Sequence, residues 1–450
     1  MADLTKIFKA YDIRGTVPDQ FDVGIAYAIG VGFAKVAASP HILVARDMRP
    51  SGEALVEAFA NGARDHGVDV TLIGLASTDL LYFASGKLNA PGAMFTASHN
   101  PAQYNGIKLC RAGAAPVGLD SGLAEVRDIA AAVLAGTGPV KHVRRGTVDH
   151  RDLLDEFCDH VLSFVDVSTF RPLKVVADTA NGMGGLVVPA VFARLPFKLD
   201  LLYGELDGTF PNHPADPLQP ANQRDLQARV IVTSADIGLA FDGDADRVFL
   251  VDELGRGLSG STTTAILAAG VLAKHPGSII LHNLICSRSV PDIIREHGGI
   301  PYRTRVGHSF IKQTMADTDA AFGGEHSAHY YFRDNYRADS GLIAAMFVLE
   351  QLCASNVPLS VLRKPFERYE ASGEINTEVD DPLDVIERIA SKFSGFDQDR
   401  LDGLTVDLGS WWFNLRPSNT EPLLRLNLEA DTRDQCDGHV ADMLALITAG

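Results

Sequence analysis

Three stretches of the chain repeat one alternation of apolar and polar positions. In each, a β-branched apolar run is followed by a polar turn, then by apolar residues at helical spacing, and then by a second apolar run. These stretches are residues 41–74, 173–204 and 278–307. The pattern predicts a buried strand, a helix and a second strand. Because such alternation favours parallel sheets covered by helices, we expect three similar α/β domains with mixed, mostly parallel sheets.

The last part of the chain has a different pattern. One helical stretch at 382–393 precedes two strand-like apolar runs within 405–430, and a final helical stretch follows. Strands and helices segregated in this way predict a small C-terminal α+β domain. We therefore expect four domains, at residues 1–150, 151–254, 255–366 and 367–450.

Length and composition narrow the class of protein. The 450 residues are too many for one compact core, while 46% hydrophobic and 22% charged residues are ordinary for a globular protein. No apolar stretch approaches the roughly 20 residues needed to span a bilayer. The first residues also lack the apolar core of a secretory signal. We therefore expect a cytoplasmic protein that does not bind membranes, as a monomer or small homo-oligomer.

Charge and cysteine usage exclude further classes. The net charge of −17, with no block of Lys or Arg, argues against nucleic acid and anionic membranes as partners. A small anion can still bind where positive groups gather locally. The five cysteines are far apart and form no CxxC pair, so we expect buried free thiols and no zinc site. They are Cys110, Cys158, Cys286, Cys353 and Cys436.

Candidate chemistry gathers in four polar loops, one in each predicted domain. The first, TASHNP, places Ser98 and His99 after a short apolar run. A serine attacks poorly at neutral pH unless a base takes its proton or a cation assists it. Lys108 is a candidate visitor to the same site, whereas neighbouring side chains often diverge, so His99 is not assigned as the base. The alternative is an ordinary turn serine.

The second loop, AFDGDADRVFLVDE, alternates Asp242, Asp244 and Asp246 with small residues. Three carboxylates in a tight loop repel one another unless a hard cation lies among them, and oxygen ligands suit Mg²⁺ or Ca²⁺. A calcium EF-hand is excluded because Arg247 stands where that loop needs glycine. Arg247 could hold an oxygen of a metal-bound phosphate. A solvated acidic turn is the alternative.

The third loop, GGEHSAHYYF, alternates Glu325, Ser327 and His329. In an extended segment these three side chains point to one side. A carboxylate, a hydroxyl and an imidazole on one face suit the hydroxyls of a sugar. The edge of an amphipathic strand is the alternative.

The fourth loop, LRPSNTEPLLRL, offers guanidinium, hydroxyl and amide groups close together. Two prolines restrict it, which reduces the entropy lost when it holds an anion. It therefore predicts a phosphate-binding loop, with a plain polar turn as the alternative. Its candidate residues are Arg416, Ser418, Asn419, Thr420 and Arg425.

These four motifs, in this order, resemble those of the α-D-phosphohexomutases, most closely the bacterial phosphomannomutase/phosphoglucomutase group. The resemblance runs from KAYDIRG at 9–15 to RPSNTEP at 416–422, nearly the whole chain. It implies four domains around a central cleft, three of which share an α/β core. It also implies an intramolecular phosphotransferase that interconverts the 1- and 6-phosphates of mannose, and also of glucose. A phosphoserine and a hexose 1,6-bisphosphate would carry the reaction.

The resemblance also implies roles for individual residues. Ser98 would be the phosphoserine, and the metal, usually Mg²⁺, would be held by its phosphate together with Asp242, Asp244 and Asp246. Glu325 and Ser327 resemble the sugar-binding pair, with His329 alongside. The distal phosphate site would comprise Arg416, Ser418, Asn419, Thr420 and Arg425. Further cleft residues would be Tyr11, Arg14, Lys108, Arg247 and His308, of which Lys108 and His308 are the candidates for general acid and base.

Two departures and several alternatives remain. Ala245 in the metal loop and Ala328 in the sugar loop stand where the family commonly has glycine, which adds strain if the position needs a positive φ. His326 replaces a common methionine and could change sugar preference. Phosphoglucosamine mutase, sugar-phosphate phosphatase and a non-catalytic sugar-phosphate sensor are the alternative functions.

Overall fold

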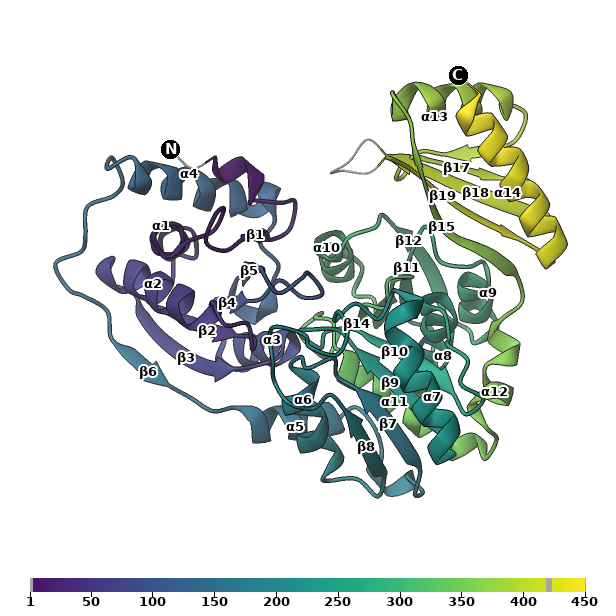
Figure 1. Cartoon of the computed structure of the whole chain (residues 1–450), viewed down its shortest axis with the longest axis horizontal. Coiled ribbons are helices and arrows are strands. Elements are labelled where there is room, and N and C mark those ends of the chain that lie inside the picture. The colour runs from purple at the N-terminus through teal and green to yellow at the C-terminus, as the bar shows by residue number, and fades with distance from the viewer. Residues whose placement is uncertain (1–2, 418–422, 450) are drawn as a thin grey trace.

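The computed structural model describes residues 3–417 and 423–449, with His308 described by its backbone alone. Four sheets follow one another along the chain, each with its own helices (Figure 1). The first three sheets are mixed and the fourth is antiparallel. The predicted fold class, three α/β domains with mostly parallel sheets and a C-terminal α+β domain, is confirmed.

The first domain is built on a six-stranded sheet with the order β1-β5-β4-β2-β3-β6. Strand β5 runs antiparallel to both of its neighbours, whereas β4, β2, β3 and β6 run parallel. Helices α1 and α2 approach each other so closely at Gly30 that no side chain fits there. A Cβ at this position would lie 2.1 Å from the carbonyl oxygen of Phe59. The strands are β1 (Ile13–Thr16), β2 (His41–Arg46), β3 (Asp69–Leu75), β4 (Gly92–Phe95), β5 (Tyr104–Cys110) and β6 (Val148–His150), and the helices are α1 (Val23–Val36), α2 (Gly52–Asp65), α3 (Thr78–Leu88) and α4 (Leu123–Leu134).

The second and third domains have four-stranded sheets with the orders β10-β9-β7-β8 and β12-β11-β13-β14. In each sheet three strands run parallel and the last in sequence is antiparallel. Their strands are β7 (Lys174–Asp178), β8 (Lys198–Leu202), β9 (Ile237–Phe241), β10 (Val248–Asp252), β11 (Ile279–Asn283), β12 (Ile300–Thr304), β13 (Phe322–Gly324) and β14 (Tyr330–Phe332). Their helices are α5 (Leu154–Leu162), α6 (Gly184–Phe192), α7 (Arg224–Thr233), α8 (Gly260–Lys274), α9 (Ser289–Glu296), α10 (His308–Thr318), α11 (Gly341–Ser355) and α12 (Leu359–Leu362).

The fourth domain is an antiparallel sheet with the order β15-β19-β18-β17-β16 and two helices. Both helices share one apolar core with the sheet, which includes Ile389, Phe413 and Ile447. Its elements are β15 (Glu370–Glu378), α13 (Pro382–Lys392), β16 (Asp397–Asp399), β17 (Leu404–Asp407), β18 (Trp411–Pro417), β19 (Leu423–Ala430) and α14 (Arg433–Thr448).

The predicted strand–helix–strand stretches are confirmed, since β2–α2–β3, β7–α6–β8 and β11–α9–β12 each join two parallel neighbouring strands. The cysteines are buried and free, as expected. In the described part of the chain, no single helix has the length and apolarity to cross a membrane, and α11 together with the bent segment after it meets that test only as a pair. The residues at which the domains begin and end stay a prediction.

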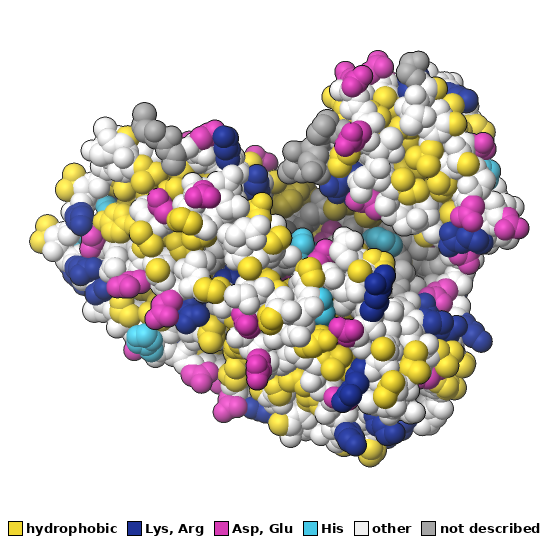
Figure 2. Space-filling model, in the orientation of Figure 1, with side chains coloured by type: hydrophobic (Ala, Val, Ile, Leu, Met, Phe, Trp, Pro, Cys, Tyr) yellow, Lys and Arg dark blue, Asp and Glu magenta, His cyan; other side chains and the backbone are white. Residues whose placement is uncertain are grey.

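The apolar cores show which domains are joined. One core runs through the second and third domains and includes α3 of the first domain together with sheet residues such as Leu43, Ile73 and Met94. The remaining core of the first domain and that of the fourth are separate. Figure 2 shows the surface hollowed between the first and fourth domains, with the second and third domains as its floor. The predicted central cleft is this hollow.

All four candidate loops are connections between antiparallel strands. They join β4 to β5, β9 to β10, β13 to β14 and β18 to β19. In the first three domains the loop leaves the carboxyl end of a strand that runs parallel to its other neighbour. Ligands of open α/β sheets bind at this end of the strands. The first three candidate loops therefore leave their sheets at equivalent positions, the carboxyl ends of β4, β9 and β13.

Candidate active site

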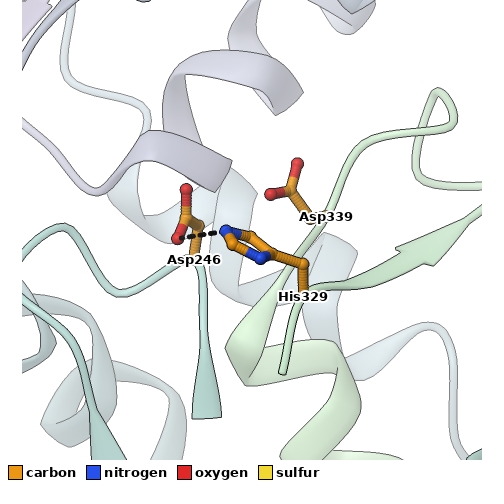
Figure 3. A group of neighbouring side chains, drawn as sticks. All are labelled: Asp246, His329 and Asp339. Atoms are coloured by element: carbon orange, nitrogen blue, oxygen red, sulfur yellow. Dashed lines mark ion pairs between the residues drawn. The ribbon is translucent and has the colours of Figure 1, made fainter. Parts of the chain in front are cut away.

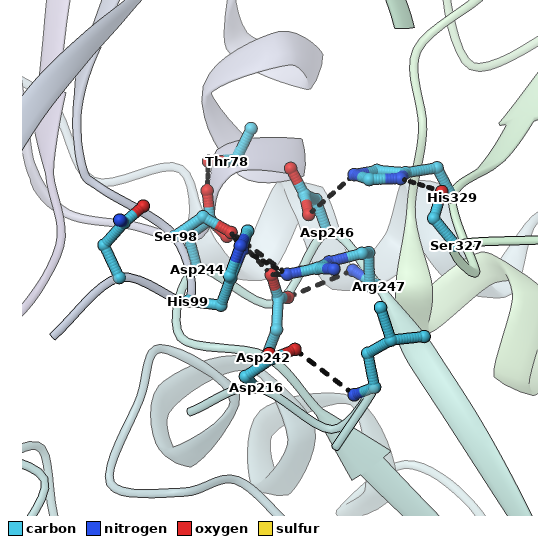
Figure 4. Close-up of polar contacts among 12 residues, drawn as sticks. Thr78, Ser98, His99, Asp216, Asp242, Asp244, Asp246, Arg247, Ser327 and His329 are labelled. Carbon is cyan, nitrogen blue, oxygen red and sulfur yellow. Dashed lines mark hydrogen bonds and ion pairs between the residues drawn. The ribbon is translucent and has the colours of Figure 1, made fainter. Parts of the chain in front are cut away.

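Ser98 lies in the loop after β4, in direct contact with the second domain. Its hydroxyl donates to a carboxylate oxygen of Asp242 at 2.7 Å, and its backbone N–H donates to the hydroxyl of Thr96 at 2.9 Å. The residue is buried and adopts a positive φ of 48°. A non-glycine residue in this region is uncommon, and such strain often occurs at functional positions. The fold thus brings the predicted serine and the predicted metal loop together (Figure 4).

Asp242, Asp244 and Asp246 converge in the turn between β9 and β10. Each offers a carboxylate oxygen within 4.8 Å of the others, and all three side chains are buried. Lys108 donates to Asp244 at 2.7 Å and to Asp246 at 2.6 Å. Among the described residues, Oδ1 of Asp244 and Oδ1 of Asp246 have no hydrogen-bond partner although both are buried. Unpartnered carboxylate oxygens in an all-oxygen cluster fit a hard divalent cation.

The environment separates the acidities of these carboxyl groups. Burial, together with the charge of Asp244, raises the pKa of Asp242 to about 6 and that of Asp246 to about 7. Burial also opposes ionisation of Asp244, but the ammonium group of Lys108 and hydrogen bonds from Lys108 and Thr78 outweigh it and hold its pKa well below the usual range. The cluster therefore gains from a positive charge among its oxygens.

Arg247 and His99 complete the surroundings of the serine. Arg247 donates from Nε to Asp242 at 2.9 Å and from Nη2 to Nδ1 of His99 at 2.6 Å, and its Nη2 lies 3.4 Å from Oγ of Ser98. Because arginine only donates, Nδ1 of His99 is an acceptor and the proton of the neutral ring is on Nε2. Burial and the charge of Arg247 lower the pKa of His99 well below its usual range. His99 is thus a neutral acceptor for the guanidinium group.

The sugar loop brings Glu325, Ser327 and His329 together by a turn. The extended segment expected from their alternation is wrong, because Ala328 adopts a φ of 65° and its N–H donates to the carbonyl of Glu325 at 3.0 Å. The Ser327 hydroxyl lies 3.1 Å from Nδ1 of His329, which also lies 3.6 Å from Glu325. A turn with a positive φ at Ala328 therefore brings the three side chains together, in place of the expected extended segment.

Glu325 is buried and held by its neighbours. Tyr331 donates its hydroxyl to the carboxylate at 2.7 Å, and the N–H of Gly307 donates at 3.2 Å. Burial raises its pKa above the ordinary value. The contact with Gly307 links the sugar loop to the segment that begins α10 at His308, whose side chain lies outside the described atoms.

A second acidic group borders the metal loop. His329 points its Nε2 at Oδ1 of Asp246, 3.9 Å away (Figure 3). Asp339 lies close by, since one ligand atom each of Asp246, His329 and Asp339 lie within 4.8 Å of one another. Burial lowers the pKa of His329 to about 4, so the ring is neutral. Asp339 pairs with Lys312 at 2.8 Å. An isolated backbone bridge between Arg247 and His329 ties the metal and sugar loops together.

The phosphate loop is only partly described. Ser418, Asn419 and Thr420 lie outside the described residues, whereas Arg416 and Arg425 stand directly opposite each other on β18 and β19. Glu374 of the neighbouring strand β15 pairs with both, at 2.5 Å from Arg416 and 3.5 Å from Arg425. This carboxylate relieves the repulsion between two like charges on facing strands.

The remaining predicted residues lie near these loops. Arg14 pairs with Asp12 and donates to the side chain of Asn100 in the serine loop. Tyr11 packs edge to face on Phe310 of α10 and lies beside Gly307, where a Cβ would come within 2.6 Å of its hydroxyl. It therefore joins the first domain to the third.

The two alanines that replace common glycines both occupy strained positions. Ala245 has a φ of 61° and Ala328 a φ of 65°, and both are fully buried. The strain expected from these departures is therefore present in the backbone. His326 points its Nδ1 at the hydroxyl of Ser261, 2.9 Å away, and lines a cavity of about 410 Å³ between the third and fourth domains.

Sequence reasoning missed three residues that shape the site. They are Asp47, which holds Arg49, Arg49, which contacts the serine loop, and Glu374, which pairs with Arg416. A signal for the first two exists, since the Asp-Met-Arg triplet follows β2 at the same edge of the sheet as the serine loop. Glu374 carries no comparable signal, because it lies in a polar strand remote in sequence from its partners.

Comparison with known proteins agrees with this arrangement. The sequence matches the Phosphoglucomutase/phosphomannomutase alpha/beta/alpha domain I over residues 5–134, domain II over 155–255, domain III over 259–369 and the C-terminal domain over 374–446. A phosphomannomutase of Salmonella montevideo is 41% identical over 432 residues, which cover 94% of each chain.

Solved structures extend the likeness. A phosphoglucomutase/phosphomannomutase family protein from Burkholderia thailandensis has a TM-score of 0.88 and 32% identity, covering 99% of this chain and 98% of that one. An Aspergillus fumigatus N-acetylphosphoglucosamine mutase in complex with GlcNAc-6P and magnesium shares the fold at a TM-score of 0.64 and 12% identity, covering 98% of this chain and 95% of the other. With four matched domains and a relative this similar over nearly its whole length, the chain belongs to the phosphoglucomutase/phosphomannomutase family of phosphohexomutase enzymes.

Proposed function

We propose that this phosphohexomutase interconverts the 1- and 6-phosphates of mannose, and also of glucose, through a phosphoserine at Ser98 and a hexose 1,6-bisphosphate. The observation that carries the proposal is the 2.7 Å contact between the Ser98 hydroxyl and Asp242, inside a cluster of three buried carboxylates. A phosphorylated serine at this point would place its oxygens among the same groups.

The metal of this site would be Mg²⁺, held by Asp242, Asp244, Asp246 and the phosphate of Ser98. The two buried carboxylate oxygens without partners among the described residues support this ligand set. When bound, Mg²⁺ would offset negative charge on the phosphoryl oxygens during transfer. Chelation is expected to stop turnover and added Mg²⁺ to restore it.

Ser98 would donate its phosphoryl group to the free hydroxyl of a hexose monophosphate, and the bisphosphate would return its other phosphate to Ser98. Phosphoryl transfer depends mainly on positioning and on stabilisation of charge. Arg247, 3.4 Å from the serine oxygen, would stabilise the oxygens of the phosphoryl group during its transfer, with Arg14 nearby. One group must remove the proton of the attacking hydroxyl and another must protonate the leaving oxygen, for which Lys108 and His308 are the candidates.

The sugar and its second phosphate would be held away from the reacting atoms. Glu325 and Ser327, with His329 alongside, would bind hydroxyls that glucose and mannose share, and Tyr11 would border them. The distal phosphate would be bound by Arg416, Ser418, Asn419, Thr420 and Arg425. Because the two phosphates of the bisphosphate exchange places, one distal site must accept the sugar in both orientations.

Product analysis tests this proposal against its alternatives. Mannose 1-phosphate, glucose 1-phosphate and glucosamine 1-phosphate are each incubated with the enzyme, Mg²⁺ and a catalytic amount of glucose 1,6-bisphosphate. We expect mannose 6-phosphate and glucose 6-phosphate as products. The kcat/KM for mannose 1-phosphate and for glucose 1-phosphate should be higher than that for glucosamine 1-phosphate. Inorganic phosphate as the main product would indicate a phosphatase, a preference for glucosamine 1-phosphate would indicate a phosphoglucosamine mutase, and binding without turnover would indicate a sensor.

The setting of the reaction stays a prediction from the sequence. We expect a cytoplasmic enzyme, a monomer or small homo-oligomer, whose partners are small hexose phosphates. Nucleic acid and membranes are not expected to bind, for the reasons of charge given above.

A further inference from the structure

We propose that Arg49 is a positioning residue that holds the backbone of the Ser98 loop in the conformation required for phosphoryl transfer. The inference rests on the proposed function, because it takes Ser98 as the residue that carries the phosphoryl group. Among the described residues, the guanidinium group of Arg49 donates hydrogen bonds only to backbone oxygens of residues 98–104 and to the carboxylate of Asp47. It therefore acts through Ser98 and does not contact reacting atoms.

The guanidinium group of Arg49 uses every one of its donors. Nη2 donates to the carbonyl oxygens of Ser98 at 2.8 Å and Asn100 at 2.7 Å, and Nη1 donates to those of Pro101 and Tyr104, both at 2.8 Å. A guanidinium group has five N–H bonds in a fixed planar fork. Four of them bind three carbonyls of the loop and that of Tyr104, the first residue of β5, and the fifth, on Nε, donates to Asp47. The loop is thus wrapped around a single cation.

The Ser98 loop needs such a partner. It leaves the sheet after β4 and returns at β5, so the carbonyl groups of Ser98 and Asn100 have no strand to pair with. Buried carbonyls without donors are costly, and Ser98 in addition has a φ of 48°. Four carbonyl dipoles that point toward one place also create a negative potential there, which a buried cation offsets. Removing the fork would take a donor from each of these carbonyl groups, of which that of Ser98 is buried.

Contacts on the other side fix the same carbonyl. A Cβ at Gly243 would lie 2.5 Å from the carbonyl oxygen of Ser98, so the metal loop packs directly on the serine backbone. The Ser98 carbonyl is therefore enclosed by the Arg49 guanidinium and the metal loop. Its hydroxyl points to Asp242 at the same time. A shift of the loop by about an ångström would move the nucleophile relative to the metal site, and errors of that size cost roughly a hundredfold in rate.

Arg49 is itself held rigidly. Its side chain and that of Asp47 are both 0% exposed, and Asp47 accepts from the Arg49 backbone N–H at 3.0 Å and from its Nε at 3.2 Å. The ring of Phe210, from the second domain, lies 5.2 Å from the guanidinium carbon. A buried charge needs such a counterion, and the aromatic face adds a favourable contact. Residues of two domains thus keep the fork in place.

The test compares Arg49→Lys and Arg49→Ala with Arg64→Ala. Arg64 is a matched control because it donates to a backbone carbonyl, that of Gly146, at 3.0 Å in the same domain but away from the site. For each protein we measure kcat and KM with glucose 1-phosphate, thermal unfolding, and phosphorylation of Ser98 by glucose 1,6-bisphosphate from intact mass. Free guanidinium chloride at low millimolar concentration is added in a second series.

We expect kcat to fall about a hundredfold in both Arg49 variants while KM changes by less than about threefold, because the distal phosphate site is untouched. Phosphorylation of Ser98 should slow in parallel. Guanidinium should restore kcat of Arg49→Ala by about tenfold or more and leave Arg64→Ala unchanged. Arg49→Lys keeps the charge but loses the fork, so it should remain folded and remain slow.

Two results would overturn the inference. One is a kcat within about threefold of the parent enzyme in a folded Arg49 variant, set against the hundredfold loss expected of a misplaced nucleophile. The other is a loss of kcat that follows the loss of thermal stability in all three variants and shows no rescue. A parent enzyme that turns over without any phosphate on Ser98 would instead overturn the proposed function, so the two failures are distinguishable.

Discussion

The hydroxyl oxygen of Ser98 lies 2.7 Å from a carboxylate oxygen of Asp242, although 144 positions separate the two residues in the chain. The contact exists because two loops at equivalent corners of two different sheets meet. It supports the proposal that Ser98 carries a phosphoryl group next to a metal ion. Removing its hydroxyl should therefore remove the reaction and leave the binding groups in place.

Ser98→Ala is expected to lower kcat by at least about a thousandfold, because a nucleophile has no substitute in a double-transfer reaction. Binding of glucose 1-phosphate, measured by titration calorimetry in the presence of Mg²⁺, should stay within a few-fold of the parent value. Ser39→Ala, a change in a loop of the same domain away from the site, is the control. Normal turnover by Ser98→Ala would exclude the phosphoserine mechanism.

Arg416→Ala should weaken substrate binding. A charge-assisted hydrogen bond contributes roughly 1.5–3 kcal/mol, which corresponds to about ten- to a hundredfold in KM. The variant also leaves Glu374 with one cation fewer, so repulsion of the phosphate adds to the loss. Steady-state kinetics check this, with Arg433→Ala, a change at an exposed ion pair of the same domain, as the control. Unchanged kinetic constants would contradict a phosphate site at Arg416.

Glu374→Gln should strengthen the binding of inorganic phosphate. The carboxylate of Glu374 pairs with Arg416 and Arg425, so a phosphate must compete with it for the same cations. Because the pair is partly exposed, we expect a modest effect, about two- to fivefold in the inhibition constant of phosphate. Glu378→Gln, the same change further along β15, should have little effect. Weaker phosphate binding would mean that Glu374 chiefly orients the arginines.

Replacing Ala245 or Ala328 by glycine should not harm the enzyme. Each alanine has a positive φ, and glycine relieves a strain of about 1–2 kcal/mol while it adds about 0.5–1 kcal/mol of backbone entropy to the unfolded chain. We therefore expect each variant to be equally stable or more stable, by up to about 1.5 kcal/mol, in urea unfolding. Ala131→Gly, at an exposed position of helix α4, is the control and should be less stable than the parent. A loss of stability at both loop positions would show that the alanine methyl groups matter for packing.

Asp79 should make stability depend on pH. It is fully buried, receives hydrogen bonds from Ser77 and Ser340, and burial raises its pKa from 3.8 to about 7. The folded state therefore holds a proton that the unfolded state releases, so this group lowers the free energy of unfolding as pH rises from about 4 to about 7.

Asp79→Asn removes that proton and should be more stable than the parent, by a margin that grows with pH up to about 7 and is constant above it. Thermal unfolding from pH 5 to 9 measures the margin, with the exposed Asp120→Asn as control. A margin independent of pH would show that Asp79 is ionised when folded.

Local sequence patterns predicted much of this molecule. The three strand–helix–strand stretches and the helix at 382–392 depend on periodicity, which is a local property. The serine and aspartate loops could be predicted because the residues that mark each of them are neighbours in the sequence. The turn at 325–329 was not, since alternation alone cannot distinguish an extended segment from a turn with a positive φ at Ala328.

Contacts set by sheet order could not be predicted. Arg49 reaches the Ser98 loop because β2 and β4 are neighbours in the sheet although β3 lies between them in the chain. Glu374 meets Arg416 across three strands whose order and register depend on the whole fourth domain. The Asp-Met-Arg triplet after β2 marks the sheet edge at which Arg49 lies. The partners of Arg49 and of Glu374, however, arise from the tertiary fold.

Each of the four loops connects two antiparallel strands, and this position affects which sequence changes a related enzyme can accept. Each loop connects two strands of its own sheet, and most apolar residues that stabilise that sheet lie in its strands and helices. Changes in a hairpin tip can therefore alter which sugar is accepted without unfolding the layer beneath it. Under the proposed function, sugar selectivity and the stability of each sheet would thus depend largely on different residues.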